Sequence, residues 1–148
     1  MRFKTIRPFR DMNRRLDKEL AKHGFERSED EAGNVSVHMS TNVRFKIPSA
    51  YPFKPPVCLY KGVDYISYLV QQQTKLAAFI AFNQIKLPCV CCHNLLCDWS
   101  PGNSLNELAL EFSATHKRFI KIKKYAGYLN KLNLDAFLVK FIGTFLDF

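Results

Sequence analysis

The sequence has no apolar run of the roughly 18–20 residues that a membrane-spanning helix needs. Its basic N-terminus, Met1 to Lys4, is not followed by an apolar segment, so we expect no secretory signal. Internal repeats, low-complexity segments and a polar linker are also absent. These absences argue against a membrane-spanning protein, a secreted protein and a repeat architecture. The length of 148 residues then predicts one domain, 1–148.

The cysteines do not have the spacing of a disulfide scaffold, which distributes its cysteines to join distant segments. Cys58 stands apart, whereas the other four cysteines lie within nine residues: Cys89, Cys91, Cys92 and Cys97. We therefore expect reduced thiols and an intracellular protein, in the cytoplasm or the nucleus.

The net charge is +9, and the basic residues gather near the N-terminus and again around residues 117–124. A basic surface attracts nucleic acid, anionic lipid or acidic proteins, and it is equally typical of a solvated helix face. If nucleic acid is the partner, binding should depend on salt and show no sequence preference.

Hydrophobic periodicity predicts an α+β chain. A helix over residues 10–23 ends at Gly24, a residue typical of a helix C-cap. Alternating residues predict a hairpin of Val35–Met39 and Val43–Ile47, followed by a stiff proline-rich loop and a short strand, Val57–Tyr60. We expect a short antiparallel meander of three or four strands flanked by helices.

The second half of the chain reads as mainly helical. We expect a helix over 65–87, ended by a proline, and a helix that begins at Ser104, whose spacing to Glu107 is that of a capping box. A basic helix over 115–129 and an amphipathic helix over 135–148 should follow. The domain core is thus predicted at about 10–112, with a basic and apolar helical extension over 113–148.

Two short strings carry a resemblance to a known family. Tyr51-Pro52-Phe53-Lys54-Pro55-Pro56 follows the strand at Val43–Ile47, and Trp99-Ser100-Pro101 precedes the helix that begins at Ser104. With a helix before both, the chain resembles the ubiquitin-conjugating enzyme (E2) family, which has a loop of the first type after its third strand and a turn of the second type before its second helix. The resemblance covers about 10–112 and implies a UBC-like fold.

The resemblance also assigns candidate site residues. An active E2 has its thioester-forming cysteine eight positions before the Trp of the turn, and this position holds Cys91. E3 ligases contact the loop Phe and the Ser-Pro of the turn, and the activating enzyme contacts the N-terminal helix. The corresponding candidates for partner binding are Phe53, Ser100, Pro101, Arg10, Arg14 and Arg15.

The sequence departs from the family at the catalytic tripeptide His-Pro-Asn, which does not occur. The Asn of that tripeptide is thought to stabilise the oxyanion formed during transfer to lysine. The nearest pair, His93-Asn94, follows Cys91 instead of preceding it. We therefore expect a non-catalytic E2-like module that binds proteins of the ubiquitin pathway or belongs to a larger assembly.

Other roles stay open. Large DNA viruses encode divergent E2-like chains, so the resemblance also allows this chain to be a component of a viral particle. An active E2 that uses Cys91 and a basic protein that binds nucleic acid without specificity are the alternatives.

The cysteine segment allows a second chemistry. Cys89 and Cys92 form a Cys-x-x-Cys pair, the usual spacing of zinc ligands, and Cys97 with either Cys91 or His93 would complete a tetrahedral site. Buried thiols that pack as small apolar groups, or catalysis by Cys91, explain the same segment.

Overall fold

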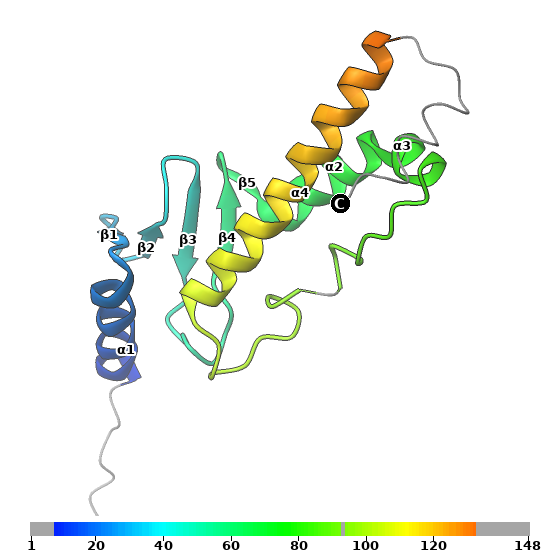
Figure 1. Cartoon of the computed structure of the whole chain (residues 1–148). Coiled ribbons are helices and arrows are strands. Elements are labelled where there is room, and N and C mark those ends of the chain that lie inside the picture. Colours follow the sequence, from blue (N-terminus) through cyan, green and yellow to red (C-terminus); the bar gives the residue numbers. More distant parts are fainter. Residues whose placement is uncertain (1–7, 93, 133–148) are drawn as a thin grey trace, which may run out of the picture.

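The structure, a computed structural model, describes residues 8–92 and 94–132, with the side chains of residues 8–13 outside that description. Along these residues the elements follow in the order α1 (Pro8–His23), β1 (Glu26–Glu29), β2 (Val35–His38), β3 (Val43–Ile47), β4 (Val57–Tyr60), β5 (Val63–Asp64), α2 (Tyr65–Lys75), α3 (Ala77–Phe82) and α4 (Leu105–Leu132) (Figure 1). The predicted α+β class is confirmed.

The five strands form one antiparallel sheet in sequence order, β1-β2-β3-β4-β5. The predicted hairpin is confirmed, since Val37 pairs with Phe45 and Phe45 pairs in turn with Cys58 of β4. The expected number of three or four strands was wrong, because β1 and β5 are added at the two edges.

Both added strands lack a buried face that would mark them in the sequence. Strand β1 reads Glu-Arg-Ser-Glu and is exposed along its whole length, as charged edge strands often are. Strand β5 has two residues and follows a tight turn in which Lys61 and Gly62 both have positive φ, 50° and 82°. Two consecutive positive φ angles are typical of a type I′ hairpin turn.

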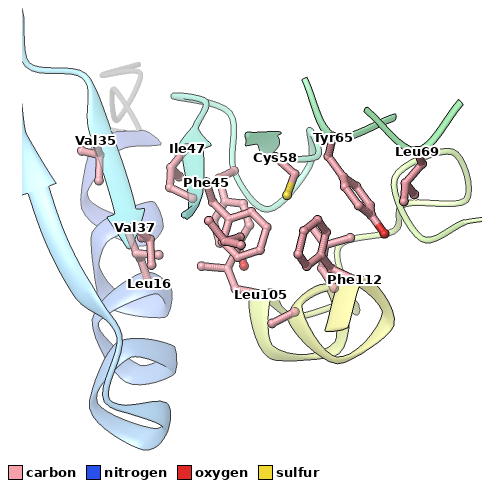
Figure 2. Packing of buried hydrophobic residues seen from close by; sticks show 14 of the residues in the cluster. Leu16, Val35, Val37, Phe45, Ile47, Cys58, Tyr65, Leu69, Leu105 and Phe112 are labelled. Carbon is pink, nitrogen blue, oxygen red and sulfur yellow. The ribbon is translucent and has the colours of Figure 1, made fainter. Parts of the chain in front are cut away.

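One face of the sheet carries the hydrophobic core. Phe45 of β3 and Cys58 of β4 lie against Leu105 and Phe112 of α4, and Leu16 of α1 lies beside the β2 valines (Figure 2). Helices α1 and α4 therefore cover the same face of the sheet. At about 0.8 kcal/mol per buried CH₂, this face is the main source of stability.

The predicted helix over 65–87 was wrong in extent. Asp64 caps α2 by accepting a hydrogen bond from the Ser67 amide at 3.0 Å, and the helix is interrupted at Leu76. Helix α3 ends where Asn83 Nδ2 donates to the Phe79 carbonyl at 2.9 Å and Gln84 takes a positive φ of 53°. Residues 83–87 are not helical.

Helix α4 begins as predicted. The Glu107 amide donates to Ser104 Oγ, and Glu107 Oε2 accepts from the Ser104 amide at 2.7 Å. The prediction of a separate basic helix over 115–129 was wrong, because α4 runs without a break through the predicted domain boundary at 112. Helix α4 contacts α2, and its C-terminal part projects past the sheet (Figure 1). The predicted helix over 135–148 lies outside the described residues.

Within the part of the chain that the structure describes, none of the helices combines the length and the apolar composition that membrane crossing requires.

Candidate functional site

The proline loop and the tryptophan turn, 47 residues apart in sequence, are in direct contact. Trp99 Nε1 donates a hydrogen bond of 2.7 Å to the Pro52 carbonyl, and the centres of the Trp99 and Tyr51 rings are 6.0 Å apart. Trp99 is partly buried against the core, as expected for a residue that anchors the turn. The two strings that carry the resemblance thus form one structural unit.

Glu19 of α1 joins this unit to two other elements. Its Oε1 accepts from the Tyr51 hydroxyl at 2.8 Å and from Arg15 Nε at 2.9 Å, while its Oε2 accepts from the Leu105 amide at 2.9 Å. The carboxylate therefore lies at the N-terminus of α4, where negative charge is favoured. Burial, followed by the hydrogen bond to Glu19, raises the pKa of Tyr51 well above its usual range.

Arg15, predicted to bind a partner, is occupied within the domain. Its guanidinium donates to the Pro101 carbonyl and, at 2.6 Å, to the Asn103 carbonyl. Arg15 therefore positions the tryptophan turn against α1. Arg14 is exposed on the same helix, and the side chain of Arg10 lies outside what the structure describes.

The three other candidates for partner binding directly follow the two residues of this contact, Phe53 after Pro52 and Ser100-Pro101 after Trp99, and are here called the loop–turn surface. All three are exposed, and Phe53 keeps 76% of its accessible area. Asn103 closes the turn, because its Oδ1 accepts from the Ser100 amide at 2.7 Å and from the Ser100 hydroxyl at 2.9 Å. A large aromatic side chain is thus held in water on a rigid support.

The cysteine segment brings three thiols together, here called the thiol cluster: Cys89, Cys91 and Cys92. Their Sγ atoms all lie within 4.8 Å of one another, and those of Cys89 and Cys91 are 2.9 Å apart. The cluster is at the surface, with Cys91 and Cys92 exposed. Three thiols at this separation can hold a metal ion. The interpretation of these cysteines as buried apolar groups is therefore wrong for all three; it fits Cys58.

Hydrogen bonds within the cluster concentrate acidity at one sulfur. Donation from the Cys91 thiol, then from the Cys92 thiol, lowers the pKa of Cys89 to about 6. The same interaction raises the pKa of Cys91, and it raises that of Cys92 to about 12. The hydrogen bonds therefore favour the thiolate at Cys89 and disfavour it at Cys91.

The rest of the segment has structural contacts. Asn94 Nδ2 donates to the Val90 carbonyl at 2.9 Å, and Asn94 Oδ1 accepts from the Cys97 amide at 3.1 Å. The Cys97 thiol donates to the Cys91 carbonyl at 3.1 Å, so it lies beside the cluster without belonging to it. His93, the other predicted ligand, lies outside the described residues.

Sequence reasoning missed two acidic residues that hold these segments. One is Glu19; the other is Glu111 of α4, whose carboxylate accepts from the Leu95 amide at 3.1 Å and so ties the cysteine segment to the core. Each of these carboxylates accepts a hydrogen bond from a backbone amide that is distant in sequence, 86 residues away for Glu19 and 16 residues away for Glu111. A single acidic residue in a helix carries no signal for such a contact.

Comparisons of the chain with protein-family models, with curated proteins and with solved structures find no match.

Proposed function

We propose that this chain is a divergent E2-like module that binds other proteins through its loop–turn surface and does not transfer ubiquitin efficiently. The order of its elements agrees with the resemblance: α1, an antiparallel meander, the proline loop, β4, the tryptophan turn and then the long helix α4. The contact between Trp99 and Pro52 joins the two strings from which the resemblance was inferred.

Two features support the absence of efficient transfer. Helices α2 and α3 lie between β4 and the cysteine segment, the part of the chain in which an E2 carries its His-Pro-Asn tripeptide. Asn94, the asparagine nearest to Cys91 in the sequence, donates its side-chain amide to the Val90 carbonyl and so has a structural role. Loss of one oxyanion donor commonly costs about 2.7–4 kcal/mol of transition-state stabilisation.

The state of the Cys91 thiol supports the same conclusion. Thioester formation requires a thiolate nucleophile. The hydrogen bond with Cys89 raises the pKa of Cys91 and so disfavours the thiolate that thioester formation needs. The exposed position of Cys91 alone does not make it reactive.

The observation that carries the binding proposal is the exposure of Phe53 on a loop that is fixed on several sides. Aromatic residues, Phe among them, are enriched at protein interfaces relative to the rest of the surface. The hydrogen bonds from Trp99, Tyr51 and Arg15 hold the loop and the turn in place before any partner arrives. Little conformational entropy is then lost on binding.

A binding experiment tests this proposal. Isolated E3 ligase domains that recognise E2s are titrated with the wild-type chain, with Phe53→Ala and with Val63→Ala. Val63 is a matched control, because it is an apolar side chain that is 54% exposed and lies on β5, outside the loop–turn surface. We expect Phe53→Ala to weaken binding at least tenfold, which is about 1.4 kcal/mol, and Val63→Ala to leave it unchanged. No binding by the wild type, or equal effects of both changes, would contradict the proposal.

The thiol cluster favours a second function, binding of zinc as a structural ion. Zinc bound to thiolates has Zn–S distances of about 2.3 Å, so tetrahedral geometry separates two sulfurs by about 3.8 Å. The three Sγ atoms of the cluster lie within 4.8 Å of one another, and Cys89 and Cys91 would need to separate from their present 2.9 Å. Small side-chain rotations therefore suffice. Cys97, whose thiol donates to the Cys91 carbonyl beside the cluster, is a candidate for a fourth ligand.

Metal content and ligand substitution test the zinc proposal. Protein purified in reducing buffer without chelator should contain one zinc per chain, and Cys89→Ser should lose it. Cobalt titration gives a thiolate charge-transfer band whose intensity reports the number of sulfur ligands, so Cys97→Ser distinguishes three ligands from four. Wild-type protein that holds no zinc at stoichiometric concentration would contradict the proposal.

A further inference from the structure

The C-terminal part of α4 carries a line of lysines on its exposed side. Lys117, Lys124 and Lys131 recur every seven residues and are all exposed. An α-helix rises 1.5 Å per residue and drifts by about 20° per seven residues, so these lysines are about 10.5 Å apart and lie within roughly 40° of one another. Together they form the basic stripe.

The part of α4 that carries the basic stripe has charges of one sign only. From Phe112 to Leu132 the sequence contains no Asp or Glu, while Arg118, Lys121 and Lys123 add to the positive charge. Because this part of α4 projects beyond the sheet, as Figure 1 shows, the acidic residues of β1 are remote from it. The stripe is therefore a region of concentrated positive potential, which attracts a polyanion.

An aromatic ring lies within the stripe. Tyr128 is 50% exposed, and Lys124 Nζ lies 5.8 Å from the centre of its ring. Positive side chains interleaved with an exposed aromatic ring are typical of surfaces that bind single-stranded nucleic acid, where lysines contact phosphates and the ring stacks on a base.

We infer that the basic stripe of α4 binds the phosphate backbone of single-stranded nucleic acid without sequence preference. This inference does not depend on the E2-like function, because it uses a different surface. The spacing of about 10.5 Å along the helix allows each lysine to reach a separate phosphate of an extended strand. Tyr128 gives the single strand its advantage over a duplex, whose bases are already stacked.

An anionic membrane is a less suitable partner for this helix. Amphipathic helices that bind membranes insert an apolar face among the lipids. The apolar face of α4, with Leu108, Phe112 and Phe119, is buried in the core of the domain. The apolar residues that stay exposed on α4, Leu110, Ile120 and Leu132, are ten or more residues apart along the helix and do not form a continuous face that could insert.

The experiment measures binding of fluorescent 20-nucleotide single strands of RNA and DNA to the full chain over a range of salt concentrations. The test variant replaces Lys117, Lys124 and Lys131 with Ala. The matched control replaces Lys18, Lys22 and Lys54, which are exposed on α1 and the proline loop. Both variants lose three positive charges, so the net charge falls equally. A third variant, Tyr128→Ala, tests stacking, and melting temperatures verify that each variant is folded.

The test variant should bind at least tenfold more weakly, and its slope of log K against log salt should fall by roughly 2, since each phosphate contact on a single strand contributes about 0.7. The control should keep most of its affinity, and Tyr128→Ala should weaken binding to single strands more than to a duplex. Equal losses in the test and control variants would overturn the inference, because net charge alone would then explain binding. Absence of binding by the wild type, or tighter binding to anionic phosphatidylserine vesicles with the same lysine dependence, would also overturn it.

Discussion

Replacement of Glu19 by Ala should destabilise the fold more than its place on an amphipathic surface helix suggests. The Glu19 side chain is 12% exposed and accepts hydrogen bonds from Tyr51, Arg15 and the Leu105 amide. Removal of the carboxylate leaves the Tyr51 hydroxyl and the Leu105 amide without this partner, at a cost of about 1–3 kcal/mol for each buried group. Because the site is only partly buried, we expect a loss of about 3 kcal/mol. For a chain of this length the melting temperature should fall by about 9 °C.

Urea unfolding followed by circular dichroism measures this loss, and a double-mutant cycle assigns it. Tyr51→Phe removes one donor and leaves the Glu19 carboxylate its other partners, so it should cost about 1 kcal/mol. Glu19→Ala should cost less in the Tyr51→Phe background than in the wild type, because no hydroxyl is then stranded. Glu31→Ala, on an exposed turn, is the control and should have an effect within about 0.5 kcal/mol. A Glu19→Ala variant as stable as the Glu31→Ala control would refute this reasoning.

Three further predictions concern the proline loop and the thiols. Replacing Pro55 and Pro56 with Gly should lower the melting temperature, because glycine widens the unfolded ensemble; an unchanged value would show that the loop is passive. Iodoacetamide should label Cys89 before Cys91, with a rate that rises around pH 6 instead of around 8.5, and mass mapping that finds Cys91 labelled first would contradict this. Burial raises the pKa of Cys58 to about 12, so above about pH 8.5 the unfolded thiol releases a proton that the folded one keeps. This thiol alone should then lower stability by up to about 1.4 kcal/mol per pH unit between pH 8.5 and 10, and Cys58→Ala should reduce the fall seen in urea unfolding by that amount; an equal fall in wild type and Cys58→Ala would contradict this.

Elements whose side-chain pattern encodes their environment could be predicted from the sequence. Val35 and Val37 alternate with polar residues because one face of β2 is buried, and Ser104 with Glu107 specifies the start of α4 through local hydrogen bonds. Strand β1 could not be predicted, because its pairing depends on β2 and its own residues are all exposed.

The limits of helices were less predictable than their existence. The interruption at Leu76 involves neither Gly nor Pro, and the positive φ of Gln84 is rare for a residue of its type, so composition gives no warning of either. The continuity of α4 past Phe112 reflects burial of Phe119 and Ile122, which the division into two helices did not anticipate.

The site was predictable where it is local in sequence. The thiol cluster joins residues at most three positions apart, so the Cys-x-x-Cys spacing already indicated it. Cys97 was expected in the same group, but its thiol donates to the Cys91 carbonyl instead. The contacts of Glu19 with Tyr51 and Leu105 span 32 and 86 residues, and only the folded chain brings them together.

A charging assay with activating enzyme, ATP and ubiquitin tests the central claim most directly. Wild type, Cys91→Ser and Cys89→Ser are compared on non-reducing gels beside an active E2. Our account predicts that the wild type forms no thiol-sensitive ubiquitin adduct above the level of Cys91→Ser while the active E2 is fully charged. A ubiquitin adduct that forms on the wild type and on Cys89→Ser, and is lost only in Cys91→Ser, would contradict it.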